Sequence, residues 1–99
     1  MRTKSLIAVD DLCVNHQIEI SFITSLAETG LIEMAFVEET AYIDATQLQK
    51  IEKFIRFYYD LDINLEGIET IQHLLQRMNT MQNEITALRN KLRRYEDDF

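Results

Sequence analysis

The chain divides into two parts in which apolar residues recur with different periods. Residues 5–62 mix short helical patterns with one stretch of alternating apolar and polar positions, whereas residues 64–95 keep a single helical period. A spacing of three and four residues indicates an amphipathic helix, and alternation indicates a half-buried strand. The sequence therefore predicts a head over residues 1–62 and one long helix over residues 63–99.

The first thirty residues predict two short helices joined by a tight turn. The apolar run at residues 6–9 predicts a short edge strand or an extended entry into the fold. Asp10 is placed to cap the helix after it, because a carboxylate accepts hydrogen bonds from first-turn amides. A break at residues 15–17 leads to a second helix that ends at Gly30, where a left-handed conformation is needed. This pattern predicts a helix-turn-helix. The apolar face of its second helix consists of Ile20, Ile23, Leu26 and Ala27.

Residues 31–43 have the composition of a β-hairpin, which we call the wing. The large side chains Met34 and Phe36 lie two positions apart before the turn, and Ala41 and Ile43 lie two positions apart after it. The turn contains neither glycine nor asparagine, so a tight two-residue turn is not expected.

A third helix follows the wing. Asp44 with Gln47 three residues later fits the pattern of a capping box. The apolar positions of the helix are Leu48, Ile51, Phe54, Ile55, Tyr58 and Leu61. Among its aromatic residues, Phe54 and Tyr58 are expected in the core, and Phe57 or Tyr59 at the surface. Asn64 is placed to cap the fourth helix.

The fourth helix carries the clearest pattern in the chain. An unbroken alternation of three and four residues, which is typical of a coiled coil, joins Ile71, Leu74, Met78, Met81, Ile85, Leu88, Leu92 and Tyr95. At about 1.5 Å per residue this helix would extend roughly 48 Å, about twice the diameter of a 60-residue head. A seam outside the head stays in water unless a partner covers it. The sequence therefore predicts a homodimer with an interface of Met78, Met81, Ile85, Leu88, Leu92 and Tyr95.

The direction of helix pairing stays open. In a parallel dimer Glu84 would face Arg89, and Lys91 would face Glu96, and both pairs are attractive. Exposed pairs of this kind contribute about 0–1 kcal/mol each, which is too little to decide between parallel and antiparallel pairing.

Composition narrows the class of protein. Hydrophobic residues make up 46% and charged residues 27% of the chain, as in soluble globular proteins. No apolar run approaches the roughly 18 residues of a membrane span, and residues 1–4 lack the features of a signal peptide. The single cysteine, Cys13, cannot form an intrachain disulfide. We expect a cytoplasmic protein without a membrane contact.

The order helix-turn-helix, wing, third helix and long dimerising helix resembles the layout of MerR-type proteins. The matching skeleton consists of Gly30-Leu31-Ile32, Tyr42, Leu48, Ile51 and Asn64-Leu65-Glu66-Gly67-Ile68. Within that superfamily the chain most resembles the chaperone-modulator (CbpM-like) branch. The pieces that match this branch are Leu12-Cys13, Gly30-Leu31-Ile32-Glu33, Leu61-Asp62, Gly67-Ile68 and the tail with Ile85, Leu88, Arg89, Leu92 and Arg94. The expected fold is mainly α, with a MerR-like winged helix-turn-helix head, a small β-hairpin wing and a long C-terminal coiled-coil helix.

This resemblance implies a function. CbpM-like proteins bind the J-domain of a DnaJ-type co-chaperone (CbpA) and limit its stimulation of a DnaK-type chaperone; they are not enzymes and need no cofactor. The alternative is a MerR-type transcriptional regulator that binds DNA. A third class is a dimerisation adaptor with an unrelated partner.

The distribution of charge disfavours nucleic acid as the partner. The net charge is −7, and residues 5–49 contain no Lys or Arg. The acids of that window are Asp10, Asp11, Glu19, Glu28, Glu33, Glu38, Glu39 and Asp44. Affinity for nucleic acid depends on Lys and Arg that neutralise phosphates. DNA-binding MerR relatives carry a Gly-Tyr-Arg-x-Tyr segment after the wing, and here residues 41–45 place Ile43 where that arginine would be.

An acidic head suits a basic protein, and J-domains generally present a positively charged second helix. Complementary charge steers such encounters. The candidate contact residues are acids near the wing: Glu28, Glu33, Glu38 and Glu39. The other interpretation is a solvated acidic surface that affects solubility alone.

No pattern in the chain predicts catalysis or metal binding. The acid pairs at residues 10–11 and 38–39 have no accompanying base, nucleophile or phosphate-binding loop. Cys13 and His16 fall short of the three or four ligands of a zinc site. We expect no catalytic residue, cofactor, metal or small-molecule ligand.

Overall fold

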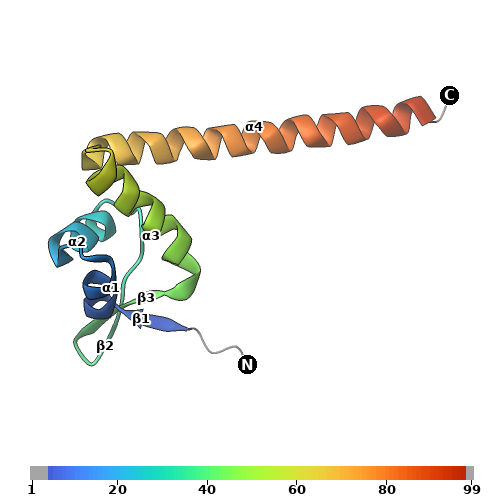
Figure 1. The fold of residues 1–99 in the computed structure, drawn as a ribbon. Helices are drawn as coiled ribbons and strands as arrows, with labels where there is room; N and C mark the ends of the chain where they lie inside the picture. The colour runs from blue at the N-terminus through green and yellow to red at the C-terminus, as the bar shows by residue number, and fades with distance from the viewer. Residues whose placement is uncertain (1–4, 98–99) are drawn as a thin grey trace. The chain divides into compact units, whose positions relative to one another are not determined.

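A computed structural model describes residues 5–97, which form four α-helices and one three-stranded sheet (Figure 1). The elements are β1 (Leu6–Ala8), α1 (Val9–His16), α2 (Ile20–Glu28), β2 (Ala35–Val37), β3 (Thr40–Asp44), α3 (Leu48–Ile55) and α4 (Leu65–Asp97). A 3-10 turn at Ala45–Gln47 precedes α3, and a π-helical turn at Arg56–Asp60 follows it. The mainly α fold with a helix-turn-helix, a hairpin wing and a long C-terminal helix is confirmed.

The chain divides into two compact units, one up to Glu69 and one from Thr70 onward. The first residues of α4 belong to the first unit, where Ile68 is fully buried in the core. Among the helices of residues 5–97, none combines the length and the hydropathy that a membrane span requires. The boundary expected between residues 62 and 63 stays a prediction.

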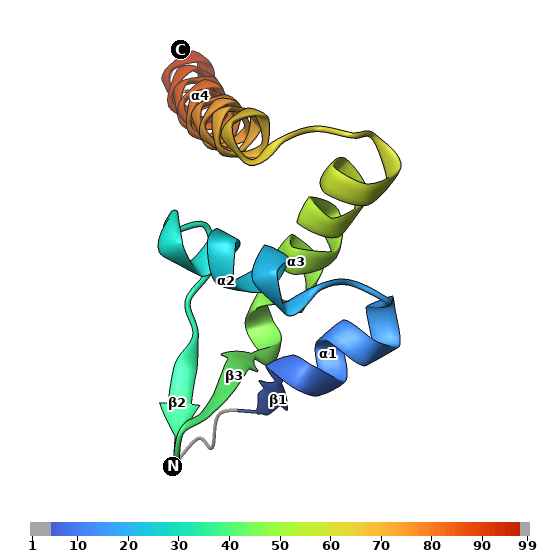
Figure 2. The same ribbon diagram turned by 90° about the vertical axis from the view of Figure 1, so that its left-hand side faces the viewer.

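The sheet is antiparallel throughout, in the order β1-β3-β2, so β1 and β2 are its edges. Figure 2 shows the chain leaving α2, entering β2 and returning through β3 toward α3. The expected wing is present, and the expected edge strand is present over Leu6–Ala8, while Val9 already belongs to α1.

The helices of the helix-turn-helix end in left-handed residues. Gly30 has a φ of 82° and donates its backbone N–H to the Ala27 carbonyl, while the Leu31 N–H donates to the Leu26 carbonyl. This is a Schellman motif, and it confirms the expected role of Gly30. α1 ends similarly at Gln17, whose φ is 56°.

The expected cap at the start of α1 is wrong. The helix begins at Val9 and its N-cap is Ala8, which makes no side-chain cap. Asp10 lies in the first turn, because pairing of Ala8 with Tyr42 in the sheet fixes where the helix begins. A carboxylate in the first turn still interacts favourably with the helix dipole.

The wing turns through two residues, which corrects the expected looser turn. Val37 pairs with Thr40, and the two residues between them, Glu38 and Glu39, have φ values of 50° and 67°. A two-residue turn with positive φ at both positions matches the right-handed twist of paired strands. The geometry of the hairpin therefore prevails over the backbone preference of glutamate.

Replacing this turn with Glu38→Asn and Glu39→Gly should stabilise the fold. A left-handed conformation costs about 1 kcal/mol for a residue with a Cβ, and Asn-Gly is the preferred pair for this turn. We expect the free energy of unfolding to rise by about 1–2 kcal/mol, measured by urea denaturation. As a control, Glu38→Gln with Glu39→Gln removes the same charges and keeps both Cβ atoms; an equal gain there would mean that charge repulsion is the cause.

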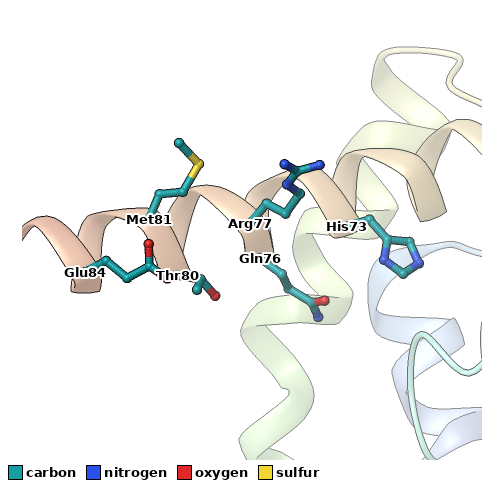
Figure 3. Close-up of a pocket in the computed structure, with 6 residues that line it drawn as sticks. All are labelled: His73, Gln76, Arg77, Thr80, Met81 and Glu84. Carbon is teal, nitrogen blue, oxygen red and sulfur yellow. The ribbon is translucent and has the colours of Figure 1, made fainter.

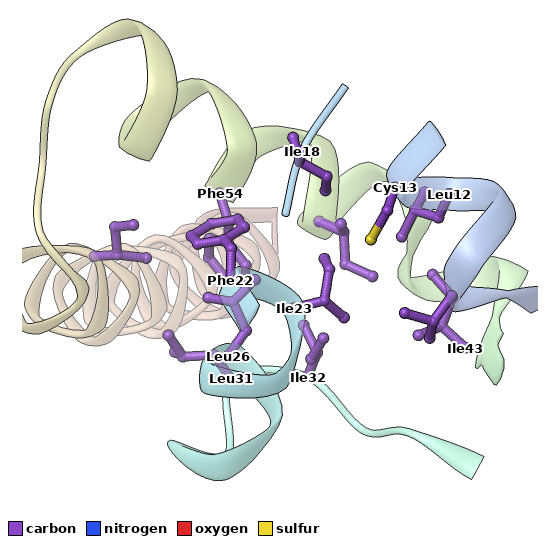
Figure 4. Packing of buried hydrophobic residues seen from close by; sticks show 13 residues of the cluster. Leu12, Cys13, Ile18, Phe22, Ile23, Leu26, Leu31, Ile32, Ile43 and Phe54 are labelled. Carbon is purple, nitrogen blue, oxygen red and sulfur yellow. The ribbon is translucent and has the colours of Figure 1, made fainter. Parts of the chain in front are cut away.

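One apolar core joins the helix-turn-helix, the sheet and α3 (Figure 4). Its buried residues are Val9, Leu12, Cys13, Ile18, Phe22, Ile23, Leu26, Leu31, Ile32, Ile43, Ile51, Phe54 and Ile68. Ile23 and Leu26 are buried as expected, and Ala27 packs against the core. Ile20 is exposed, contrary to expectation, because it opens α2 at the edge of the core and the buried aromatic Phe22 follows it.

After Phe54, the side chains that face the core differ from the predicted ones. Phe54 is fully buried, but Tyr58 and Leu61 are exposed, and Phe57 packs against the core in place of Tyr58. The π-helical turn explains this difference, since its wider winding rotates the following side chains about the axis. The Tyr58 ring packs on Phe22 with 4.5 Å between centroids. Tyr59 is exposed, as expected for one of the aromatic pair, and its hydroxyl accepts a hydrogen bond from the Glu19 N–H.

The predicted helix caps by Asp44 and Asn64 are both present, but the Gln47 side chain binds a different partner from the one that its pattern predicts. Asp44 Oδ1 accepts from the Thr46 N–H at 3.0 Å, and Asn64 Oδ1 accepts from the Gly67 N–H at 2.8 Å. The capping-box pattern pairs Gln47 with Asp44. The Gln47 side-chain amide instead binds the backbone of Glu33.

Candidate functional site

The four candidate acids lie on three segments of the first unit. Glu28 is the last residue of α2, Glu33 lies in the loop before β2, and Glu38 and Glu39 form the turn of the wing. All four are exposed. Within residues 5–97 none of the four carboxylates forms an ion pair or a hydrogen bond with another side chain or the backbone. Each is therefore free to meet a partner without first breaking a contact in this part of the chain.

The structure brings two of these acids together in one surface depression. Glu28 and Glu33 line a depression of about 550 Å³ where α2, the following loop and β2 meet. Its remaining lining residues are Thr24, Ala27, Gly30, Ile32, Met34 and Phe36. Glu38 and Glu39 lie at the far end of β2 and do not line it.

Two devices hold the loop that forms this depression. The Schellman motif at Gly30 fixes the exit from α2. The Gln47 side chain then accepts from the Glu33 N–H through Oε1 and donates to the Glu33 carbonyl through Nε2, both at 2.8 Å. Because the loop is bound at both ends, the depression is ordered before any partner arrives, which lowers the entropy lost on binding.

The surface that a DNA reader would use presents acids and no cations. Along α2 and its N-cap, Glu19, Ser21 and Glu28 are exposed, and residues 5–49 contain no Lys or Arg. Ile43, which stands where DNA-binding relatives carry arginine, is fully buried in the core. Without cations on this face, phosphate neutralisation by residues 5–49 is absent.

A comparison with protein families identifies the chain. The family model described as MerR HTH family regulatory protein matches residues 7–90. The chain belongs to the MerR helix-turn-helix family. The match covers the helix-turn-helix, the wing, α3 and most of α4. The resemblance to MerR-type proteins is therefore confirmed for this MerR-family chain at the level of the superfamily. A comparison with curated proteins finds no match. Assignment to the CbpM-like branch stays a prediction.

The cysteine of this MerR-family chain is structural. Cys13 is buried, and its sulfur points into the core (Figure 4). Burial raises the pKa of its thiol, and the nearby Asp10 carboxylate raises that pKa further. Both effects keep the group in its less reactive thiol form. No group of three or more His, Cys, Asp or Glu residues within the described range 5–97 is arranged to hold a metal ion.

The predicted dimer seam lies along α4. Its six predicted interface residues are between 42% and 65% exposed: Met78, Met81, Ile85, Leu88, Leu92 and Tyr95. A groove beside the seam is lined by His73, Gln76, Arg77, Thr80, Met81 and Glu84, all from α4 (Figure 3). A groove built by one helix is the space between successive side chains, so we assign it no ligand.

Two residues of the candidate site escape sequence reasoning. The pattern of the wing identifies Phe36 only as a strand residue, yet it is 65% exposed and lines the depression. The capping pattern places Gln47 in a local cap, yet it binds a backbone fourteen residues away. No signal in the sequence marks Phe36 as a surface residue, because its neighbours in β2, Ala35 and Val37, are also apolar and show no alternation.

Proposed function

We propose that this MerR-family chain regulates a chaperone by binding a protein, namely the J-domain of a DnaJ/CbpA-type co-chaperone, and limits its stimulation of a DnaK-type chaperone. The observation that carries the proposal is the charge of residues 5–49, which include the helix-turn-helix and the wing. Seven acids of this stretch are exposed, and the stretch contains no Lys or Arg. We call the surface that carries these seven acids the acidic face. A DNA-reading scaffold with this charge favours a cationic protein surface over a phosphate backbone.

The proposed mechanism is steric. The acidic face covers the basic helix of the J-domain, and a covered J-domain cannot dock on the DnaK-type chaperone. Charge complementarity speeds the encounter and disfavours partners of the same sign. No bond is made or broken, and no residue of the site has to act as an acid, a base or a nucleophile.

We further propose that α4 pairs with α4 of a second copy. Every residue from His73 to Asp97 is exposed in the single chain. Isolated helices are marginal in water, because most helix stability in proteins comes from packing of an apolar face. A seam of alternating three and four spacing fits a partner of the same spacing. Glu84, Arg89, Lys91 and Glu96 beside it supply both signs of charge, so one copy complements another.

The proposed place of action is the cytoplasm, where J-domain co-chaperones and DnaK-type chaperones meet. A single buried thiol suits that reducing compartment, since the chain needs no disulfide for its core.

The proposal is tested by measuring J-domain binding to the full chain while salt is raised from about 0.1 M to about 1 M. The Debye length falls from about 10 Å to about 3 Å over that range, so we expect the affinity to drop by at least about tenfold. The same complex should lower J-domain-stimulated ATP hydrolysis by the DnaK-type chaperone. Absence of binding, or an affinity indifferent to salt, contradicts the proposal. Tight binding to duplex DNA in a parallel titration would favour a transcriptional regulator instead.

A further inference from the structure

The depression between α2 and β2 is lined by apolar residues and by two acidic residues. Ile32 forms part of it and is 2% exposed, Met34 is half-buried, and Phe36 stands 65% exposed. Glu28 and Glu33 are the two charged residues among those that line it. We call this depression, with the lining residues given above, the α2–β2 pocket.

The exposure of the large aromatic side chain of Phe36 suggests that a partner covers it. It lies in β2, an edge strand whose three residues are all exposed, and it therefore adds little to the core. Exposed aromatic residues beside a recess are typical of interface centres, where aromatic anchors contribute most of the binding energy. Met34 beside it has an unbranched, adaptable side chain that can adjust to an incoming group.

The two acidic residues of the pocket favour a partner that carries basic side chains next to an apolar one. Glu28 and Glu33 line the pocket from two different segments, and neither carboxylate has a partner within residues 5–97. A helix whose Lys or Arg residues lie three or four positions from an apolar residue presents all of them on one face. Such a face matches a pocket that is lined by both apolar and acidic residues.

We propose that the α2–β2 pocket receives one large apolar side chain from a basic amphipathic helix of the partner, while Glu28 and Glu33 receive cations on that same helix face. This inference rests on the proposed function, because the helix is taken to belong to the J-domain partner. It adds an apolar anchor to an interface otherwise argued from charge. Gln47 is a positioning residue here, since it holds the Glu33 backbone without lining the pocket.

The test is Phe36→Ser in the full chain, with J-domain affinity measured across the same salt range. We expect the affinity to fall about 30-fold, as for a central interface anchor. The slope of affinity against salt should stay the same, because no charge is removed. Phe36→Leu should retain most of the affinity, since a large apolar side chain remains.

The matched control is Val14→Ser, which removes an exposed apolar side chain of α1 that does not line the pocket. Its affinity should equal that of the natural chain. If the natural chain binds and Phe36→Ser binds within about twofold of it, with an unchanged unfolding midpoint, the pocket assignment is overturned and the proposed function stands. If the natural chain does not bind the J-domain, both are overturned.

Discussion

Two glutamates in the seam of α4, introduced together as Ile85→Glu and Leu88→Glu, should convert the proposed dimer into a monomer. The two side chains are 42% and 65% exposed in the single chain, so a partner helix has apolar area left to bury. Burying the remaining area of four such side chains in a dimer contributes about 1 kcal/mol each. The change should therefore weaken dimerisation at least about 1000-fold, and the added carboxylates would repel one another across the seam.

Sedimentation equilibrium over a range of protein concentrations measures this change. The control is Asn83→Glu with Asn90→Glu, which adds the same two charges to the same part of α4 outside the seam. That variant should remain a dimer. Far-UV circular dichroism adds a second readout, because a helix without its partner loses helicity. A natural chain that sediments as a monomer, or a double seam variant that remains a dimer, would show that α4 does not pair as proposed.

The elements most fully predicted from the sequence depend on local patterns. The seam of α4 repeats over residues 71–95, and Asn64 caps α4 through a residue three positions away, so both can be read from nearby residues. Gly30 belongs to the same group, since a left-handed helix end needs no distant contact. The helix-turn-helix and the wing could also be predicted, because the order of short helices and the hairpin along the chain matches the layout of MerR-type proteins.

The sequence-based predictions are wrong where contacts between distant residues, or the geometry of a whole element, determine the local conformation. The wing turn is tight because paired strands twist, although Glu38 and Glu39 disfavour its backbone conformation. Tyr58 leaves the core because a π-helical turn rotates the chain after α3, and no residue pattern announces that turn. Gln47 pairs with Glu33 across fourteen residues, which a local capping pattern cannot reveal.

The candidate site is predictable as a set of exposed acids, but its shape is not. Acids near a predicted turn are expected at the surface because a buried unpaired carboxylate is costly. That Glu28 and Glu33 share a depression depends on the loop between α2 and β2 and on its anchor at Gln47. The apolar part of that depression stays hidden in the sequence, because alternation in a three-residue strand does not show which side faces water.

Removing the four candidate charges together should weaken J-domain binding about 100-fold. The variant carries glutamine at the four positions Glu28, Glu33, Glu38 and Glu39, and it changes the net charge from −7 to −3, since four negative charges are lost. Exposed ion pairs contribute up to about 1 kcal/mol each, so losing several of them costs roughly 2–3 kcal/mol of binding free energy. Much of the loss should appear as slower association, because the charges act mainly by steering.

Stopped-flow association and titration calorimetry with the full chain measure both effects. The matched control removes four exposed acids of the first unit that lie outside residues 5–49, as Glu52→Gln, Asp60→Asn, Asp62→Asn and Glu66→Gln, and has the same net charge. An equal loss of affinity in that control would mean that overall charge matters and that the face beside the wing has no special role. The turn variant Glu38→Asn with Glu39→Gly separates binding from folding, because it should raise the free energy of unfolding while it lowers the affinity. A turn variant that gains stability and keeps full affinity would remove Glu38 and Glu39 from the interface and leave Glu28 and Glu33 as its acidic residues.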